Sequence, residues 1–256
     1  MVGNVILAGG NELRPGCEEM DRRVLDAAGG REARVVFLPT AVAHYDPVGS
    51  GRGAVAYWRR LGARCDVAMI LNRADADDPR WARMIEDATL IYLGGGDPDV
   101  LLDALHGSPA WEAMQRAYER GAVVGGSSAG AMVVCGQTLI PGRGSGTLDQ
   151  APWAPGLGLV PDALVWPHYT PDKEGAAISL AARLAAEVSP SIALLGVPEQ
   201  QGLLGGADGW EVAGRGPIVV FQHGRTRSYM ARARARASTT MRPIDAPRAG
   251  ATTRDH

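Results

Sequence analysis

Six short apolar runs divide this chain, and the segments between them have helical patterns. Each run is bounded by Gly, Pro or Asn; they cover residues 4–10, 34–40, 65–71, 89–96, 122–128 and 192–199. Such runs, without strict alternation of polar and apolar residues, are typical of strands buried on both faces of a parallel sheet. Strands that alternate with helices form βαβ units. The sequence therefore predicts an α/β fold with a doubly wound, mostly parallel sheet flanked by helices.

Three later segments depart from this pattern. Residues 138–163 are rich in Gly and Pro and predict a long loop. Residues 210–229 resemble short strands joined by a Gly turn, which predicts antiparallel pairing near the C-terminus. Residues 231–256 carry six Arg and two Asp without a periodic apolar face, so we expect a disordered, Arg-rich tail. Residues 1–230 are then predicted to form a single domain.

Composition excludes several classes of protein. Of the 256 residues 46% are hydrophobic, which is ample for a core, and the net charge of −2 argues against a nucleic-acid partner. No apolar run is long enough for a membrane span, and the N-terminus has no basic region of the signal-peptide type. Cys17, Cys65 and Cys135 are too widely spaced for a disulfide framework or a zinc site. We expect a soluble cytoplasmic protein without metal, cofactor or membrane partner; a homodimer is left open.

The sharpest local motif lies at residues 126–130, which read GSSAG and fit the G-x-S-x-G nucleophile elbow centred on Ser128. An apolar strand precedes the motif and an apolar helix start follows it. Small residues are needed there because the nucleophile sits on a tight turn that neighbouring backbones approach closely. The N-terminus of the next helix offers N–H groups to a developing oxyanion. The plain alternative is a strand-to-helix turn whose serine only caps the helix.

A serine nucleophile needs a base, and the chain has five histidines. His168 is the preferred candidate because it follows an apolar run and a proline, where a parallel strand delivers a side chain beside the elbow. His106 ends a helical segment, and His256 lies in the tail. His44 follows the second strand in a loop, and His223 follows a late strand.

The base in turn needs an orienting carboxylate. Glu199 ends the apolar run 192–199, so we expect it to leave the sheet at the same edge as His168. Its plain alternative is a solvated glutamate after a strand.

A second glycine cluster lies at residues 93–102, again between a strand and a helix. Its glycines can present backbone N–H groups to an oxyanion or a phosphate. The spacing does not fit a nucleotide-binding fingerprint, so nucleotide binding is weakly supported. Asp97 and Asp99 have a plain interpretation as residues at the helix N-terminus.

Together these motifs resemble the serine peptidase family of peptidase E (aspartyl dipeptidase) and cyanophycinase. The resemblance spans about residues 3–222 and rests on LAGGNELRPGCEEMD, LGGGDPDVLLDAL, GGSSAGA, PHY and GVPE. The family has a fold similar to class I glutamine amidotransferases, a flavodoxin-like arrangement, with serine in place of the cysteine nucleophile. This implies the same kind of doubly wound sheet that the apolar runs predict.

The resemblance also implies roles. Ser128 would be the nucleophile, His168 the base and Glu199 the orienting acid. The oxyanion would be held by the backbone of Ala129 and of the turn at Gly95 and Gly96, with Asp97 beside it as a substrate contact. Some members use an Asp between the serine and the histidine; Asp149 is the nearest such residue here and ranks below Glu199. The implied substrates are short peptides, with dipeptides that begin with Asp as a first guess.

The sequence departs from the family pattern in two places. Asp97 stands where the family usually has Asn or Gln, and the Arg-bearing segment expected after the histidine is not matched. Lys173 and Arg183 are the only cations in the corresponding segment, and Lys cannot replace the fork geometry of Arg. The resemblance therefore supports the triad better than it supports the substrate. Hydrolysis of small peptides is favoured over degradation of cyanophycin.

Two other functions stay open at this point. An esterase of the α/β-hydrolase type has the chain order Ser, acid, His, which here would be Ser128, Asp208 and His223. A non-catalytic protein of the same fold could use its glycine loops to bind a small ligand.

Overall fold

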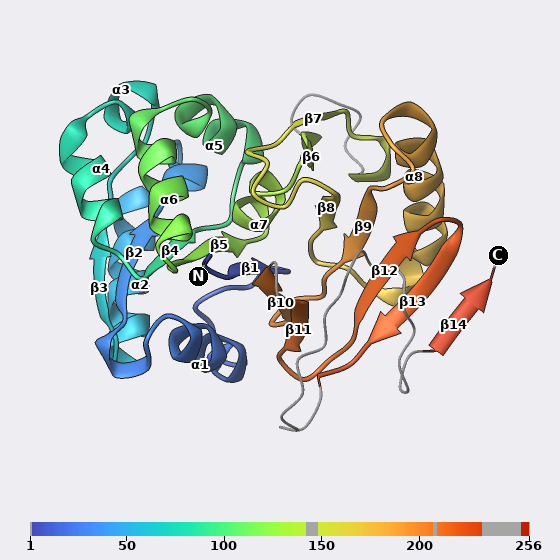
Figure 1. The fold of residues 1–256 in the computed structure, drawn as a ribbon, viewed down its shortest axis with the longest axis horizontal. Coiled ribbons are helices and arrows are strands. Elements are labelled where there is room, and N and C mark those ends of the chain that lie inside the picture. The colour runs from blue at the N-terminus through green and yellow to red at the C-terminus, as the bar shows by residue number, and fades with distance from the viewer. Residues whose placement is uncertain (1, 142–147, 207–208, 232–251, 256) are drawn as a thin grey trace.

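The computed structural model describes residues 2–141, 148–206, 209–231 and 252–255. Its largest sheet has seven strands in the order β11-β10-β1-β5-β4-β2-β3 (Figure 1). These are β1 (Val5–Ala8), β2 (Arg34–Leu38), β3 (Arg64–Val67), β4 (Leu90–Leu93), β5 (Val123–Ser127), β10 (Gly202–Gly206) and β11 (Gly209–Ala213). The five strands from β1 to β3 in this order pair in parallel, whereas β10 and β11 are antiparallel. The predicted mostly parallel α/β sheet is confirmed.

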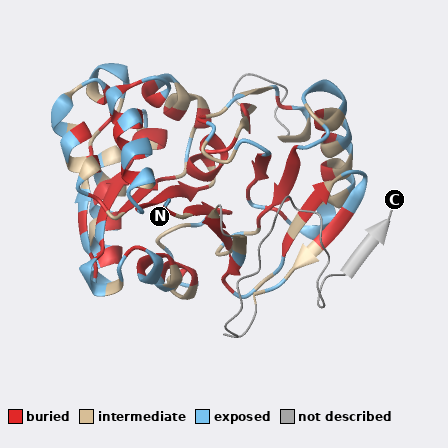
Figure 2. Cartoon of the chain, in the orientation of Figure 1, coloured by how far each residue is buried: buried red, intermediate tan, exposed pale blue. Residues whose placement is uncertain are grey.

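Helices cover both faces of this sheet because its buried strands alternate the direction of their side chains. In β1, Ile6 and Ala8 belong to the core beneath α1 (Glu18–Ala27) and α2 (Pro47–Arg60), and Val5 and Leu7 face the opposite core. The opposite core includes α3 (Arg73–Ala76), α4 (Pro79–Glu86), α5 (Pro98–Leu105), α6 (Pro109–Glu119) and α7 (Ala129–Val133). Figure 2 shows the strands buried and the outer helix faces exposed. No helix in the described ranges is long and apolar enough to cross a membrane.

A second sheet lies beside the first in Figure 1 and has the order β14-β13-β12-β9-β8. Its strands are β8 (Ala163–Trp166), β9 (Ala193–Gly196), β12 (Ile218–Gln222), β13 (Arg225–Tyr229) and β14 (Thr252–Asp255), and α8 (Glu174–Glu187) packs against β9 and β12. Only β8 and β9 pair in parallel. The antiparallel strands expected near the C-terminus are confirmed. The apolar run 192–199, expected in the same sheet as the others, lies in this second sheet instead, because burial alone does not specify a pairing partner.

Two predicted irregular segments contain more structure than expected. Within the predicted loop, β6 (Gln137–Leu139) and β7 (Trp153–Pro155) form an antiparallel pair, while residues 142–147 lie outside the described part. Within the predicted disordered tail, β14 pairs with β13, whose edge offers unpaired backbone groups. Residues 232–251 and 256 lie outside the described part, so their disorder stays a prediction.

Short 3-10 turns join several elements: η1 (Gly30–Glu32), η2 (Thr40–Val42), η4 (Leu148–Gln150) and η5 (Pro171–Lys173).

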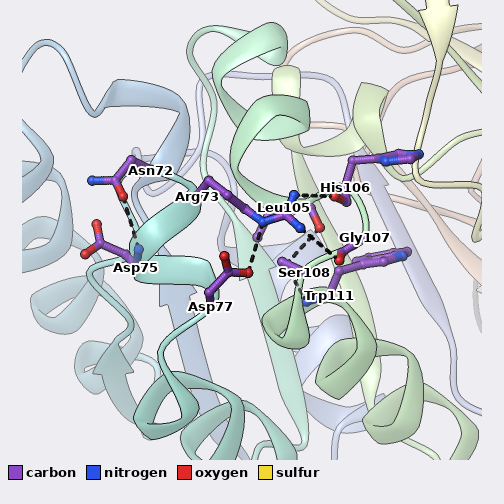
Figure 3. Close-up of polar contacts among 9 residues, drawn as sticks. All are labelled: Asn72, Arg73, Asp75, Asp77, Leu105, His106, Gly107, Ser108 and Trp111. Carbon is purple, nitrogen blue, oxygen red and sulfur yellow. Dashed lines mark hydrogen bonds and ion pairs between the residues drawn. The ribbon is translucent and has the colours of Figure 1, made fainter.

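The C-terminal end of α5 is held by Arg73 of α3, which donates to the carbonyl oxygens of His106 (2.8 Å) and Gly107 (3.1 Å) (Figure 3). Ser108 then starts α6, since its Oγ accepts the Trp111 N–H at 3.1 Å. These contacts fix α5, whose N-terminus follows the second glycine cluster.

Candidate active site

Ser128 sits at the turn between β5 and α7 with a backbone conformation that residues other than glycine rarely adopt. Its φ is 50° and its ψ is −116°. The Ser128 N–H donates to the Ala8 carbonyl at 2.9 Å, and the Ser128 carbonyl accepts the Met132 N–H that starts the helix. Strain of this kind persists only where surrounding structure imposes it, and it concentrates at functional sites. The turn has the strand–turn–helix context that a nucleophile elbow requires.

Both glycines of the G-x-S-x-G motif are required by close backbone approach. A Cβ at Gly126 would lie 2.0 Å from the Leu93 carbonyl oxygen, and one at Gly130 would lie 2.2 Å from the same atom. The end of β4 therefore leaves no room for a side chain on either side of Ser128. The small residues that the motif predicts at this turn are therefore required by the Leu93 backbone, which lies against it.

Three predicted side chains form one chain of hydrogen bonds. Ser128 Oγ lies 3.1 Å from His168 Nε2, and His168 Nδ1 lies 2.8 Å from Glu199 Oε1. When Nδ1 carries the proton and donates it to the carboxylate, Nε2 presents a lone pair to the serine hydroxyl. This is the geometry in which a histidine can take a proton from a serine.

These three residues come from two different sheets. Ser128 follows β5 of the first sheet, whereas His168 follows β8 and Glu199 follows β9, which are neighbours in the second sheet. The loop after β1 joins the two groups: the His168 N–H donates to the Gly9 carbonyl at 2.7 Å, and the Gln200 N–H donates to the Gly10 carbonyl at 3.2 Å.

Gly10 also makes room for the imidazole. Its φ is 124°, and a Cβ there would lie 2.2 Å from His168 Cε1. The ring of the candidate base therefore packs directly on the backbone of the loop after β1. In the sequence this segment supported the family resemblance without a role for Gly10; the available signal was a Gly-Gly pair after a buried strand.

The predicted oxyanion site needs one revision. The Gly95 N–H donates to Glu12 Oε1 at 2.7 Å, so this N–H is already engaged. The candidate donors are instead the N–H of Gly96, whose φ of 140° requires glycine, and the N–H of Ala129, the first residue of α7. The Asp97 N–H donates to the Ala41 carbonyl at 2.9 Å and holds the turn in place.

Glu12 is the site residue that sequence reasoning missed. Its second oxygen, Oε2, accepts the Ser127 hydroxyl at 2.9 Å, so the carboxylate contacts both the glycine turn and the residue before Ser128. A glutamate in a polar loop gives no signal by itself. Its position after the first strand, whose carboxyl end lies beside that of β5, was the available clue.

Of the remaining predicted polar residues, Lys173 contacts the backbone of the candidate base, whereas Asp97 and Asp149 make other contacts. Asp97 precedes α5 without a side-chain bond to the helix, and its carboxylate raises the pKa of the exposed Tyr45. Asp149 lies in η4, where its carbonyl accepts from Arg183, and the carboxylate hydrogen-bonded to His168 Nδ1 is that of Glu199. Lys173 Nζ donates to the His168 carbonyl at 2.6 Å.

The alternative esterase triad is not brought together. His223 lies in the turn between β12 and β13, whereas His168 occupies the position beside Ser128. Asp208 lies outside the described residues.

Other reactive groups do not form a second centre in the described residues. Burial raises the pKa of the Cys17 thiol to about 11 and those of Cys65 and Cys135 to about 12, so none is a thiolate near neutral pH. Nor do His, Cys, Asp and Glu in the described part form a group of three that could hold a metal ion.

The sequence model of peptidase family S51 matches residues 5–210 of the chain. The chain belongs to peptidase family S51. This places it among the serine-type peptidases and confirms the family that the motifs resembled. The match covers every residue of the hydrogen-bonded chain, from the loop after β1 to Glu199.

Named S51 relatives are only moderately similar. A cyanophycinase of Geminocystis herdmanii is 30% identical over 171 residues, which are 65% of this chain and 62% of that protein. A cyanophycinase of Synechococcus elongatus is 29% identical over 229 residues, or 85% of this chain and 67% of the relative. The solved structure of a peptidase from an acI-B1 Actinobacterium has a TM-score of 0.70 at 25% identity and covers 90% of this chain and 95% of its own.

Proposed function

We propose that this S51 protein hydrolyses peptide bonds of short peptides, with Ser128 as nucleophile, His168 as general base and Glu199 as the acid that orients it. The observation that carries the proposal is the continuous pair of hydrogen bonds, 3.1 Å and 2.8 Å, from Ser128 through His168 to Glu199. The positive φ at Ser128 supports it, because a serine used only as a helix cap does not need a strained backbone.

The reaction follows from the positions of these atoms. His168 Nε2 takes the proton of Ser128 as its Oγ attacks the scissile carbonyl carbon. The carbonyl oxygen becomes negative, and the N–H groups of Gly96 and Ala129 are the proposed donors to it. His168 then protonates the leaving amine, and a water activated by the same imidazole releases the acyl group from Ser128.

Glu199 has an electrostatic and orienting role in this proposal. Its carboxylate accepts the Nδ1 proton, which fixes the tautomer and stabilises the imidazolium that forms after proton transfer. The side chains of His168 and Glu199 are 45% and 52% exposed, so solvent and a small substrate can reach the base.

Short peptides are proposed as substrates because the resemblance to peptidase E implies them. A dipeptide with N-terminal Asp would need a cation near the site, and Lys173, bonded to the His168 carbonyl, is one candidate. Arg183 is engaged elsewhere, because it donates to the Asp149 carbonyl and stacks on Trp153 at 4.8 Å. The two cyanophycinases compared above are 30% and 29% identical to the chain, which is too distant to carry that substrate over to it.

A dipeptide library tests the proposal directly. We expect release of free amino acids from a subset of dipeptides by the purified protein and none by Ser128→Ala. Pairs that differ only in Asp or Asn at the first position measure the acidic preference, and Lys173→Met should reduce that preference if Lys173 supplies the cation. The proposed function would be contradicted if the wild-type protein cleaved neither dipeptides nor any longer peptides.

A further inference from the structure

The Glu12 carboxylate bridges two parts of the site that belong to different chain segments. Oε1 accepts the Gly95 N–H at 2.7 Å, and Oε2 accepts the hydroxyl of Ser127, which is fully buried, at 2.9 Å. A Cβ at Gly95 would lie 2.9 Å from Glu12 Oε1 and 3.2 Å from Ser128 Cβ. The bridge therefore runs alongside the candidate nucleophile.

Sheet register explains how one side chain can reach both groups. β5 lies between β1 and β4, all three are parallel, and Ala8 pairs with Ser127 as Leu93 pairs with Gly126. The three strands end at one edge of the sheet. Glu12 leaves the loop after β1, passes over the end of β5 and reaches the turn after β4.

The backbone on both sides of Glu12 adopts an unusual conformation. Asn11 has a φ of 58° and Leu13 a φ of 60°, in the left-handed region, which Asn tolerates and Leu rarely occupies. Each costs conformational energy that other contacts must offset. The loop is held by Cys17, whose Sγ donates to the Asn11 carbonyl at 3.2 Å.

We propose that Glu12 is a positioning residue that holds the Gly95–Gly96 turn against the nucleophile elbow and so sets the spacing of the two oxyanion donors. This inference rests on the proposed function. The Gly96 and Ala129 N–H groups come from different turns, after β4 and after β5. Two donors stabilise an oxyanion only when both are fixed close to its position, and small displacements are costly.

The bond pattern supports a positioning role. A carboxylate that accepts from an N–H and an O–H makes two charge-assisted bonds, which are stronger than bonds between neutral groups. Within the described residues no Lys, Arg or His forms an ion pair with Glu12, so these two donors are the contacts that the structure assigns to it.

Glu12→Ala and Glu12→Gln separate positioning from charge. A glutamine can keep both contacts, since its amide oxygen can accept from Gly95 and its amide nitrogen can donate to the Ser127 oxygen. We expect Glu12→Ala to lower kcat by about 10- to 100-fold with KM little changed, a smaller loss than the 10²–10³ for removal of an oxyanion donor. Glu12→Gln should recover most of the wild-type kcat, and Glu32→Ala, at an exposed glutamate of η1, is the matched control with unchanged kcat.

Two readouts distinguish failure of this inference from failure of the proposed function. The first is kcat and KM on one cleaved dipeptide, and the second is the rate at which a fluorophosphonate labels Ser128, which needs no peptide substrate. Cleavage by the wild type together with an unchanged kcat in Glu12→Ala would overturn this inference alone. Absence of both cleavage and labelling in the wild type would overturn the proposed function and this inference with it.

Three further results would also decide the question. Equal losses in Glu12→Gln and Glu12→Ala would contradict positioning, because they would show that the negative charge is needed. A change in KM alone would contradict it as well, since it would indicate a substrate contact. Should Glu12→Ala fail to fold, Ser127→Ala removes one arm of the bridge and must lower kcat by a few fold for the inference to stand.

Discussion

The two halves of the candidate active site are built in different ways. The nucleophile half is enclosed by backbone: Gly126 and Gly130 both press on the Leu93 carbonyl, and Ser127 is fully buried. The base half is open, with His168 and Glu199 about half exposed in loops after two strands of the second sheet. One half is fixed by packing and the other by a few hydrogen bonds.

This difference predicts whether a substitution in each half changes stability, activity or both. Changes in the nucleophile half disturb the packed first sheet and should alter stability and activity together. Changes in the base half meet mainly Gly9, Gly10 and solvent, so they should alter activity with little effect on stability. The loop after β1 contacts both halves and is the place where they are coupled.

The largest expected effect is loss of the base. His168→Ala should lower kcat by ~10³–10⁶ because no other imidazole contacts Ser128 in the described residues. His223→Ala, in the hairpin turn between β12 and β13, should lose little and serves as the matched control. Kinetics on one dipeptide suffice. An active His168→Ala beside an inactive His223→Ala would contradict the assignment of His168 as the base.

Removal of the orienting charge should have a smaller effect. Glu199→Gln keeps the size of the side chain but cannot stabilise the imidazolium as a carboxylate does, so we expect a loss of ~10²–10⁴ in kcat. The melting temperature should change little because the side chain is about half exposed. A loss in Asp149→Asn that exceeds the loss in Glu199→Gln would show that the acid had been misassigned.

Paired glycine substitutions test the contrast between packing and hydrogen bonding most directly. Gly126→Ala forces a Cβ against the Leu93 backbone and should destabilise the fold by about 2–4 kcal/mol. Gly10→Ala meets the movable ring of His168, and the φ of 124° at this position adds backbone strain of about 1–3 kcal/mol, so we expect it to lower activity by roughly 10-fold or more through displacement of the base in addition to that stability cost. Thermal unfolding and dipeptide kinetics of both variants check this; a Gly10→Ala variant that folds with wild-type activity would remove the distinction between the halves.

The smallest effect on catalysis is expected at Asp21, a buried residue of α1. Burial raises the pKa of Asp21 to about 7, although the Tyr57 hydroxyl donates to its Oδ2 at 2.6 Å. The folded protein therefore retains a proton that the unfolded chain releases near pH 4, and the free energy of unfolding falls as pH rises from about 4 to about 7.

Asp21→Asn should remove this pH dependence and leave dipeptide hydrolysis unchanged. From pH 4 to pH 8 we expect the stability of the variant relative to the wild type to rise by about 4 kcal/mol, since each pKa unit corresponds to ~1.4 kcal/mol and the pKa is raised from 3.8 to about 7. Urea unfolding at pH 4, 6 and 8 measures the difference. A constant difference across these pH values would contradict the raised pKa.

Much of the fold and all three residues of the candidate triad could be predicted because their signals are local. The elbow at Ser128 is a short motif with a physical reason for each glycine, and His168 and Glu199 each follow an apolar run. The division into two sheets could not be predicted, since strand pairing depends on contacts between distant segments. The bridge from Glu12 could not be predicted for the same reason, because its partners Gly95 and Ser127 are 83 and 115 residues away in the sequence.

The central claim is that Ser128 is the nucleophile and that His168 activates it. Reaction with a fluorophosphonate, followed by mass spectrometry of the digested protein, tests this without knowledge of the substrate. We predict one adduct on Ser128, unchanged in position in Ser127→Ala, absent in Ser128→Ala and formed much more slowly in His168→Ala. An adduct on Ser127, or no adduct on the wild-type protein, would contradict the claim.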